Sequence, residues 1–168
     1  MTLAEILHGS AYGRDLFSRH AKLIEALENE ITVKATPDGK QVPYVKCVIR
    51  DKEIKLTPEE VVRQLYTKIL IDDYGYPKER ITYEFPVHFG RETKRADIVI
   101  RDAGDFTVPY IIVEVNNQAA EGGRELLKSF TIATGASMAV WTNGNSTAYY
   151  QHKTPSCFED IKDIPKNS

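Results

Sequence analysis

The chain has 168 residues, 42% of them hydrophobic, which suffices for one domain with an ordinary core. It carries 22 basic and 24 acidic residues. The resulting formal net charge of −2 argues against a protein that grips nucleic acid by bulk charge, although a local basic patch is compatible with it. The start of the chain has no basic segment followed by an apolar core, and no apolar run reaches membrane-spanning length. We therefore expect a cytoplasmic protein without membrane contact.

The cysteines and histidines do not indicate a zinc site or a disulfide framework. Cys47 and Cys157 are far apart and form no C-x-x-C pair, so we expect both to be reduced thiols. The four histidines are scattered without the spacing of metal ligands.

Residues 1–56 are expected to extend the core with one helix and one hairpin. From Arg14 to Asn29, apolar residues recur at helical spacing beside polar ones, which predicts an amphipathic helix. The runs 31–35 and 41–50 flank the segment 37–40, whose proline and glycine favour a turn. The two runs are therefore predicted to pair as strands.

A second helix is predicted to begin after Thr57. Thr57 can cap it, Pro58 suits the first helical position, and Glu60 stands where a capping box requires an acid. Glu60 thus has a purely structural explanation beside any role in a site, and the sequence leaves both open. The segment 74–77, with its glycine and proline, is expected to end this helix.

Three extended runs follow the helix and predict three strands. They span Ile81 to His88, Arg95 to Arg101 and Pro109 to Val115. The third run is continuously apolar, which is typical of a central strand covered on both faces.

The remaining part of the chain is predicted to add one helix and two strands. The helix should run from about Glu121 to Thr134, and a buried strand should follow from Ser137 to Thr142. Asn143-Gly144 predicts a two-residue hairpin turn that returns Ser146 to His152 as a partner strand. The fold class is therefore mixed α/β: a core over residues 57–160 in the order helix, three strands, helix, two strands. Residues 161–168 are expected to form a tail or linker.

Two acidic residues stand at positions that can meet across this sheet. Asp97 comes early in one strand and Glu114 late in the next, so that an antiparallel pairing would bring both carboxylates to one edge. Together with the backbone carbonyl of Val115 they would suit Mg²⁺ or Mn²⁺, which prefer oxygen ligands. Strand alternation points Asn116 to the side of Glu114, and Gln118 as well if the strand continues.

These residues carry a resemblance to a known family. It rests on four separated runs in the same order, which are Leu56–Gln64, Lys94–Asp97, the strand that contains Glu114, and Trp141–Gly144. From about Val45 to about Pro165 the chain resembles the PD-(D/E)xK nuclease superfamily and, within it, the N-terminal nuclease domain of type I restriction enzyme R subunits.

The resemblance implies a restriction-endonuclease-like fold and Mg²⁺-dependent hydrolysis of phosphodiesters in double-stranded DNA. It implies that Asp97 and Glu114 bind the metal and that Glu60 supports the site. The partners it implies are other restriction-modification subunits, or fused helicase or methyltransferase domains. This chain has no Gly-x-x-x-x-Gly-Lys-Ser/Thr loop, so ATP use is not expected within it.

The chain departs from the family pattern at two places. The family's lysine falls on Asn116, which brings no positive charge, and by analogy with the loss of one electrostatic stabiliser the rate would fall by about 10²–10³-fold or entirely. The family's Gln-x-x-x-Tyr element reads Leu126 and Phe130. These two residues share one helical face, which should pack as core or bind something apolar.

Another cation could serve the site in place of the lysine. Arg95 is the first candidate, because it shares its strand face with Asp97. Arg63, one helical turn after Glu60, is the second. A further group of Arg91, Lys94, Arg95 and Arg101 is either a phosphate-facing patch or a solvated strand edge.

The sequence leaves two main hypotheses about function. The first is a restriction-type, Mg²⁺-dependent DNA endonuclease that is impaired by Asn116. The alternative is a catalytically inactive relative that serves as a DNA-binding or partner-docking module in restriction-modification or phage defence. A regulator or scaffold unrelated to nucleic acid ranks last.

Overall fold

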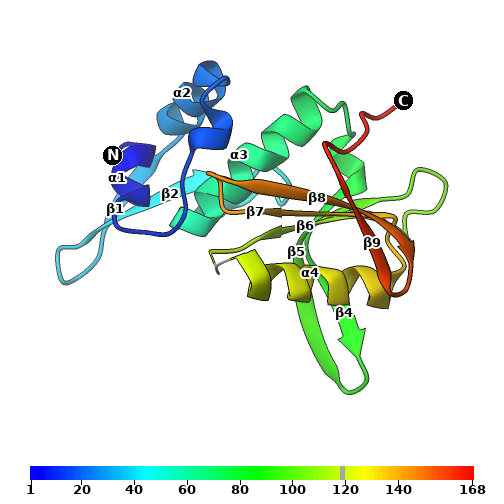
Figure 1. The fold of residues 1–168 in the computed structure, drawn as a ribbon. Helices are drawn as coiled ribbons and strands as arrows, with labels where there is room; N and C mark the ends of the chain where they lie inside the picture. Colours follow the sequence, from blue (N-terminus) through cyan, green and yellow to red (C-terminus); the bar gives the residue numbers. More distant parts are fainter. Residues whose placement is uncertain (118–119) are drawn as a thin grey trace.

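The computed structural model describes residues 1–117 and 120–168, apart from the side chains of residues 120 and 121. Its centre is a six-stranded sheet in the order β4-β5-β6-β7-β8-β9, with α3 on one face and α4 on the other (Figure 1). A separate sheet, β1-β2-β3, lies on the α3 side together with α1 and α2. The elements are α1 Leu3–Leu7, the 3-10 turn η1 Asp15–Phe17, α2 Ala21–Asn29, β1 Thr32–Ala35, β2 Gln41–Lys46, β3 Glu53–Lys55, α3 Pro58–Asp72, the 3-10 turn η2 Lys78–Arg80, β4 Ile81–Phe89, β5 Glu92–Arg101, β6 Pro109–Val115, α4 Ala120–Thr134, β7 Met138–Thr142, β8 Thr147–Thr154 and β9 Cys157–Ile161.

The mixed α/β class is confirmed, and the core elements follow in the predicted order up to β8. A third strand after α4, β9, was not predicted. Strand β6 is the continuously apolar run, and it lies between β5 and β7, where both of its faces are covered. It pairs antiparallel with β5 but parallel with β7, because α4 carries the chain back across the sheet between them.

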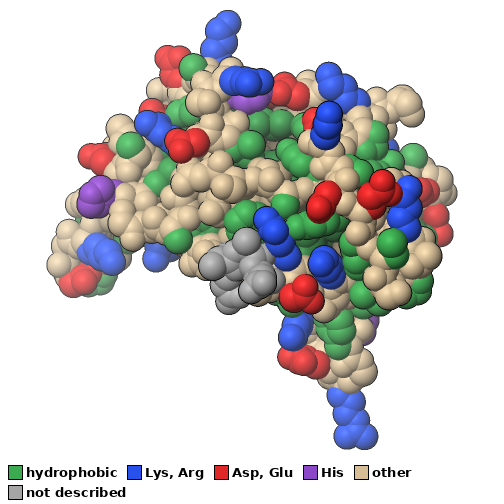
Figure 2. Space-filling model, viewed as in Figure 1, with side chains coloured by type: hydrophobic (Ala, Val, Ile, Leu, Met, Phe, Trp, Pro, Cys, Tyr) green, Lys and Arg blue, Asp and Glu red, His purple; other side chains and the backbone are tan. Residues whose placement is uncertain are grey.

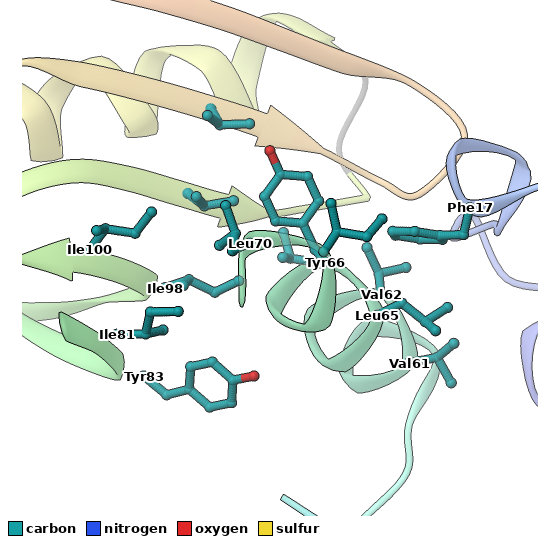
Figure 3. Close-up of a cluster of buried hydrophobic side chains, with 14 of the residues drawn as sticks. Phe17, Val61, Val62, Leu65, Tyr66, Leu70, Ile81, Tyr83, Ile98 and Ile100 are labelled. Atoms are coloured by element: carbon teal, nitrogen blue, oxygen red, sulfur yellow. The ribbon is translucent and has the colours of Figure 1, made fainter. Parts of the chain in front are cut away.

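Helix α3 begins and packs as its sequence predicts. The Thr57 hydroxyl accepts a hydrogen bond from the Glu60 backbone N–H at 3.2 Å, and Pro58 is the first helical residue. The apolar side of the helix lies in the larger of two core clusters, where Phe17 of the N-terminal region packs beside it (Figure 3). Burying these side chains contributes roughly 1.5–3 kcal/mol each, so α3 is the main link between the sheet and the first 56 residues.

The predicted helix from Arg14 to Asn29 is wrong over its first half. The chain makes the short turn η1, and the α-helix begins only at Ala21. The cause is tertiary, because the backbone N–H of Gly13 donates to Asn143 and that of Leu16 donates to Gly144. Helix α1 and strand β3 were not predicted. They have five and three residues, too few for a periodic pattern.

The predicted two-residue turn at Asn143-Gly144 is also wrong. Thr142 pairs with Thr147, so the loop has four residues, 143–146. The Asn143 side chain accepts hydrogen bonds from the backbone N–H groups of Asn145 and Ser146, which stabilises the longer loop.

The chain beyond β8, including residues 161–168 that were expected to form a tail or linker, packs on the core. Strand β9 joins the edge of the sheet, and Ile164 is buried in the larger core cluster. The Tyr76 hydroxyl donates to the Pro165 carbonyl at 2.6 Å, and the Asn167 backbone N–H donates to the Tyr74 carbonyl at 2.7 Å. Residues 161–168 are therefore held against the turn that ends α3.

None of the helices in the described part of the chain has the length and apolar character needed to cross a bilayer.

Gly144→Ala tests the contact between the 143–146 loop and the N-terminal segment. Gly144 has a φ of +88°, and a Cβ at this position would lie 2.0 Å from the Gly13 carbonyl oxygen. Gly39 has a similar φ of +81° but open space around it. In urea denaturation, Gly144→Ala should lower the free energy of unfolding by about 1–3 kcal/mol more than Gly39→Ala does, because only the former overpacks an interface. If both variants lost the same free energy of unfolding, the contact between Gly144 and Gly13 would not contribute to stability.

Candidate functional site

The sheet brings Asp97 and Glu114 together, as their spacing predicted. Ile98 of β5 pairs with Val113 of β6, so that the next position on each strand is one of the two acids. The Asp97 backbone N–H donates to Glu114 Oε1 at 3.0 Å, and the Val115 backbone N–H donates to Asp97 Oδ2 at 2.8 Å. Each carboxylate thus accepts a hydrogen bond from the other strand, which fixes the pair across the end of the β5–β6 ladder.

Both carboxylates lie in a largely dry environment. Glu114 is 4% exposed and the Asp97 side chain 15%. Burial raises the pKa of Asp97 to about 7, although Arg63 and the Val115 backbone N–H act in the opposite direction. Burial also raises the pKa of Glu114 well above its ordinary value, and the negative charge of Asp97 adds to this increase. A proton on this pair is therefore held much more firmly than on an exposed carboxylate.

Arg63 of α3 supplies the positive charge at this pair. Its side chain is 5% exposed, and its Nη2 lies 3.2 Å from Asp97 Oδ1 and 3.0 Å from Glu59 Oε1. Its Nη1 lies 2.6 Å from Glu84 Oε1 and 3.8 Å from Glu60 Oε2. Burial by itself would lower the pKa of Arg63, but these acids raise it. The guanidinium is thus the centre of a carboxylate cluster, a name used here for Glu59, Glu60, Glu84, Asp97 and Glu114.

Glu84 is a member of the cluster that the sequence did not reveal. It lies within β4, yet its φ is +54°, in the left-handed region that side chains other than glycine rarely adopt. Such a conformation costs on the order of 1–3 kcal/mol and is most often found at functional sites. Its carboxylate is the one nearest to Arg63. In the sequence it looks like any polar residue of an alternating strand, so no local signal could have identified it.

The α3 acids and Tyr12 complete the surroundings of Arg63. The Glu60 carboxylate accepts a hydrogen bond from Gln64 Nε2 at 2.7 Å, so its side chain turns into the cluster, and only its backbone N–H is used by the Thr57 cap. The Tyr12 hydroxyl donates to Glu59 Oε2 at 3.1 Å. Burial, followed by the charge of Glu59, raises the pKa of Tyr12 above its ordinary value. A residue that precedes the core by more than forty positions therefore contacts the site.

The first candidate for a replacement cation, Arg95, does not lie at Asp97, whereas the second, Arg63, does. Arg95 is exposed, and its Nη1 donates to the Glu84 carbonyl at 3.3 Å, so Arg63 and not Arg95 is the cation at Asp97. The backbone N–H of Asn116 donates to the Thr142 carbonyl at 3.0 Å. A Cβ added at Gly123 of α4 would lie 3.5 Å from Asn116 Cγ, so this amide is beside α4. Gln118 lies outside the described residues.

Leu126 and Phe130, the positions where the resemblance implies a Gln-x-x-x-Tyr element, are used for packing. Phe130 is 1% exposed in the smaller core cluster, and its ring centroid lies 5.8 Å from that of Phe89 in β4. Leu126 is partly buried against the same cluster. Of the two alternatives for this face of α4, packing as core or binding something apolar, the structure shows the first.

The residues as arranged do not fit a divalent metal ion. Three oxygens of the Asp97 and Glu114 carboxylates already accept N–H groups from Val115, Asp97 and Arg63. Within residues 1–117 and 120–168, no three acidic, histidine or cysteine side chains converge as a metal centre requires. The positive charge that a metal would bring is supplied by a guanidinium, which cannot act as a metal ligand.

Comparison with known proteins identifies the family to which this part of the chain belongs. Residues 58–165 match a family model described as the type I restriction enzyme R protein N terminus. The match starts at the first residue of α3 and includes every member of the carboxylate cluster, whereas Tyr12 and both N-terminal helices precede it. No match is found among curated proteins or among solved structures.

The raised pKa of Asp97 predicts how stability depends on pH. An unfolded aspartate titrates near about pH 3.9, so from there to about pH 7 the folded state holds the additional proton. The free energy of unfolding should therefore fall as the pH rises through this window, by up to about 1.4 kcal/mol per pH unit from this one group. Asp97→Asn should remove this contribution, so that its stability at pH 5 and pH 7, measured by urea denaturation, differs less than that of the wild type.

The exposed Asp160→Asn variant is the matched control for this comparison, and it should keep the wild-type dependence. If Asp97→Asn also kept it, Asp97 would not be the group that causes the dependence.

Proposed function

Because this chain belongs to the family of type I restriction enzyme R protein N termini, we propose that it serves a restriction-modification system by contacting double-stranded DNA without cutting it. The observation that carries the proposal is the state of the carboxylate cluster. Arg63 lies at its centre and pairs with Asp97 and Glu84, while position 116 holds an amide where the resemblance implies a lysine. The protein is proposed to act in the cytoplasm, beside other restriction-modification subunits or helicase or methyltransferase domains.

The loss of hydrolysis follows from the charge at the site. Cleavage of a phosphodiester builds negative charge on the phosphate, which must be stabilised by cations that face the substrate. Asn116 brings no charge to that position, and Arg63 is 5% exposed and engaged by four carboxylates. Neither residue therefore presents a positive charge to a bound phosphate in this arrangement.

The surface proposed to contact DNA is the arm, a name used here for residues 85–96 of β4 and β5. The pairing of β5 with β6 begins at Ile98. Between residue 85 and residue 96 the described backbone of β4 and β5 pairs as a hairpin alone, and the two strands project from the sheet as a two-stranded ribbon (Figure 1). Five residue pairs give it a length of about 16 Å. The major groove, which is about 12 Å wide, admits such a ribbon.

The arm has the charge that a phosphate backbone requires. Arg91, Lys94 and Arg95 are all exposed, and Glu92 is the one acid in the same stretch. Figure 2 shows Lys and Arg side chains along this projection. One face of the arm packs against the protein up to the turn, because Val87 is 2% exposed and the ring centroid of Phe89, next to the turn, lies 5.8 Å from that of Phe130 in α4. A local basic patch is compatible with the net charge of −2. The basic side chains of the arm form such a patch, and contacts of this kind to phosphates position a protein on DNA.

A second candidate function is the Mg²⁺-dependent endonuclease that the resemblance implies. The convergence of Asp97 and Glu114 at the end of β6 favours it. In that case Asp97, Glu114 and the Val115 carbonyl would hold Mg²⁺ or Mn²⁺ after a rearrangement, and Arg63 would supply the charge that Asn116 lacks.

A plasmid-nicking assay with Mg²⁺ and with Mn²⁺ separates the two candidates. The wild type, Asn116→Lys and Glu114→Ala are compared at equal concentration. All three should leave supercoiled plasmid intact, because a lysine at position 116 does not release Asp97 from Arg63. Nicking by the wild type that disappears in Glu114→Ala would instead establish the endonuclease. Nicking by Asn116→Lys alone would show that this one residue silences the site.

Binding to duplex DNA tests the arm. With EDTA present, a fluorescein-labelled duplex is titrated with the wild type, with Arg91→Ala/Lys94→Ala/Arg95→Ala, and with Lys40→Ala/Lys52→Ala/Lys55→Ala. The last three lysines are exposed but lie outside the arm, so both variants lose the same charge. The arm variant should bind more weakly, and the slope of log K against log salt should decrease in magnitude by about 2–3, whereas the control should keep wild-type binding. If both variants lost the same affinity for DNA, the effect would come from net charge alone and the arm would not be the contact surface.

A further inference from the structure

We infer that Arg63 is the resident counter-ion of the carboxylate cluster and keeps divalent metal ions out of it. The inference concerns the chemistry of the cluster alone, and it holds whether or not the chain contacts DNA. The inference and the proposed function both rest on the contacts of Arg63 with the cluster. The test of the inference involves no nucleic acid, so the two can fail separately.

The guanidinium uses the oxygens that a metal would need. It contacts Asp97 Oδ1 at 3.2 Å, Glu59 Oε1 at 3.0 Å and Glu84 Oε1 at 2.6 Å. The other Asp97 oxygen and Glu114 Oε1 accept backbone N–H groups. A guanidinium is a planar fork of donors that stays protonated in proteins, so it satisfies several carboxylates at once without ever becoming a ligand.

The charge of Arg63 also opposes metal binding directly. A Mg²⁺ or Mn²⁺ ion bound to Asp97 would lie about 2 Å from a carboxylate oxygen that is itself within hydrogen-bonding distance of Arg63. Two cations would then share one buried carboxylate, and their repulsion is strong where water is excluded. Arg63 and a metal ion would therefore compete for Asp97.

Three features hold Arg63 in this position. Its side chain starts from the buried face of α3 and is only 5% exposed. Its guanidinium lies 5.5 Å from the ring centroid of Tyr83, within the range of a cation–π contact. The left-handed backbone of Glu84 directs that carboxylate toward the guanidinium. A strained residue on a neighbouring strand thus engages the arginine, as expected if the ion pair is an established part of the site.

Metal binding without DNA tests the inference. Mn²⁺ is titrated by isothermal titration calorimetry into four proteins at pH 7.5, and the bound ion is counted by electron paramagnetic resonance. The proteins are the wild type, Arg63→Gln, Arg95→Gln and the double variant Arg63→Gln/Asp97→Asn. Arg95→Gln is the matched control, because it removes the same charge from an exposed side chain whose hydrogen bond, within the described part of the chain, is to the Glu84 backbone carbonyl and not to a carboxylate.

The wild type and Arg95→Gln should show no saturable site at millimolar Mn²⁺. Arg63→Gln should gain one site with affinity at least about tenfold above that of the wild type, since the repulsion has been removed. The double variant should lose the gained site, which locates it at Asp97. Wild-type binding as tight as that of Arg63→Gln, or a folded Arg63→Gln that gains no affinity, would overturn the inference.

If Arg63→Gln is unfolded without metal, circular dichroism supplies the decisive readout. Mn²⁺ should then restore the native spectrum of Arg63→Gln but not that of the double variant, because the ion replaces the missing counter-charge only where Asp97 can bind it. Failure of Mn²⁺ to refold Arg63→Gln would equally overturn the inference.

Discussion

The packing of one buried guanidinium among carboxylates is the constraint on which the rest of this structure depends. Arg63 joins α3 to β4 through Glu84 and to β5 through Asp97, and Asp97 in turn holds the backbone of β6 at Val115. Buried charges are costly unless they are paired and fully hydrogen-bonded, so the three strands and the helix must keep one relative position. The same constraint accounts for the left-handed residue inside β4, because Glu84 is the nearest partner of Arg63 and its ion pair offsets the cost of the strained backbone.

The first 56 residues are part of this arrangement, although the family match begins only at residue 58. Tyr12 contacts Glu59 at the rim of the cluster, and the adjacent Gly13 approaches Gly144 more closely than any side chain would permit. The loop 143–146 therefore does more than connect two strands. It packs against the N-terminal segment, which holds the Tyr12 hydroxyl beside Glu59 of the cluster.

The sequence predicted those features that depend on local periodicity. The cap at Thr57, the central strand β6 and the meeting of Asp97 with Glu114 all follow from patterns of two or 3.6 residues and from the pairing of neighbouring strands. It did not predict Glu84, whose importance comes from a backbone angle that the identity of the residue does not reveal. It ranked Arg95 above Arg63, because strand alternation describes one strand only and not the helix that covers it. The helix expected from Arg14 and the turn at Asn143 were wrong for one reason, a long-range contact between the two segments.

A double-mutant cycle on Arg63 and Asp97 tests the central claim most directly. The free energy of unfolding is measured in urea for the wild type, Arg63→Gln, Asp97→Asn and the double variant. If the guanidinium and the carboxylate stabilise the fold as a pair, the loss in the double variant should be smaller than the sum of the single losses by about 0.5–3 kcal/mol. Additive losses would contradict the account, because each residue would then stabilise the protein independently of the other.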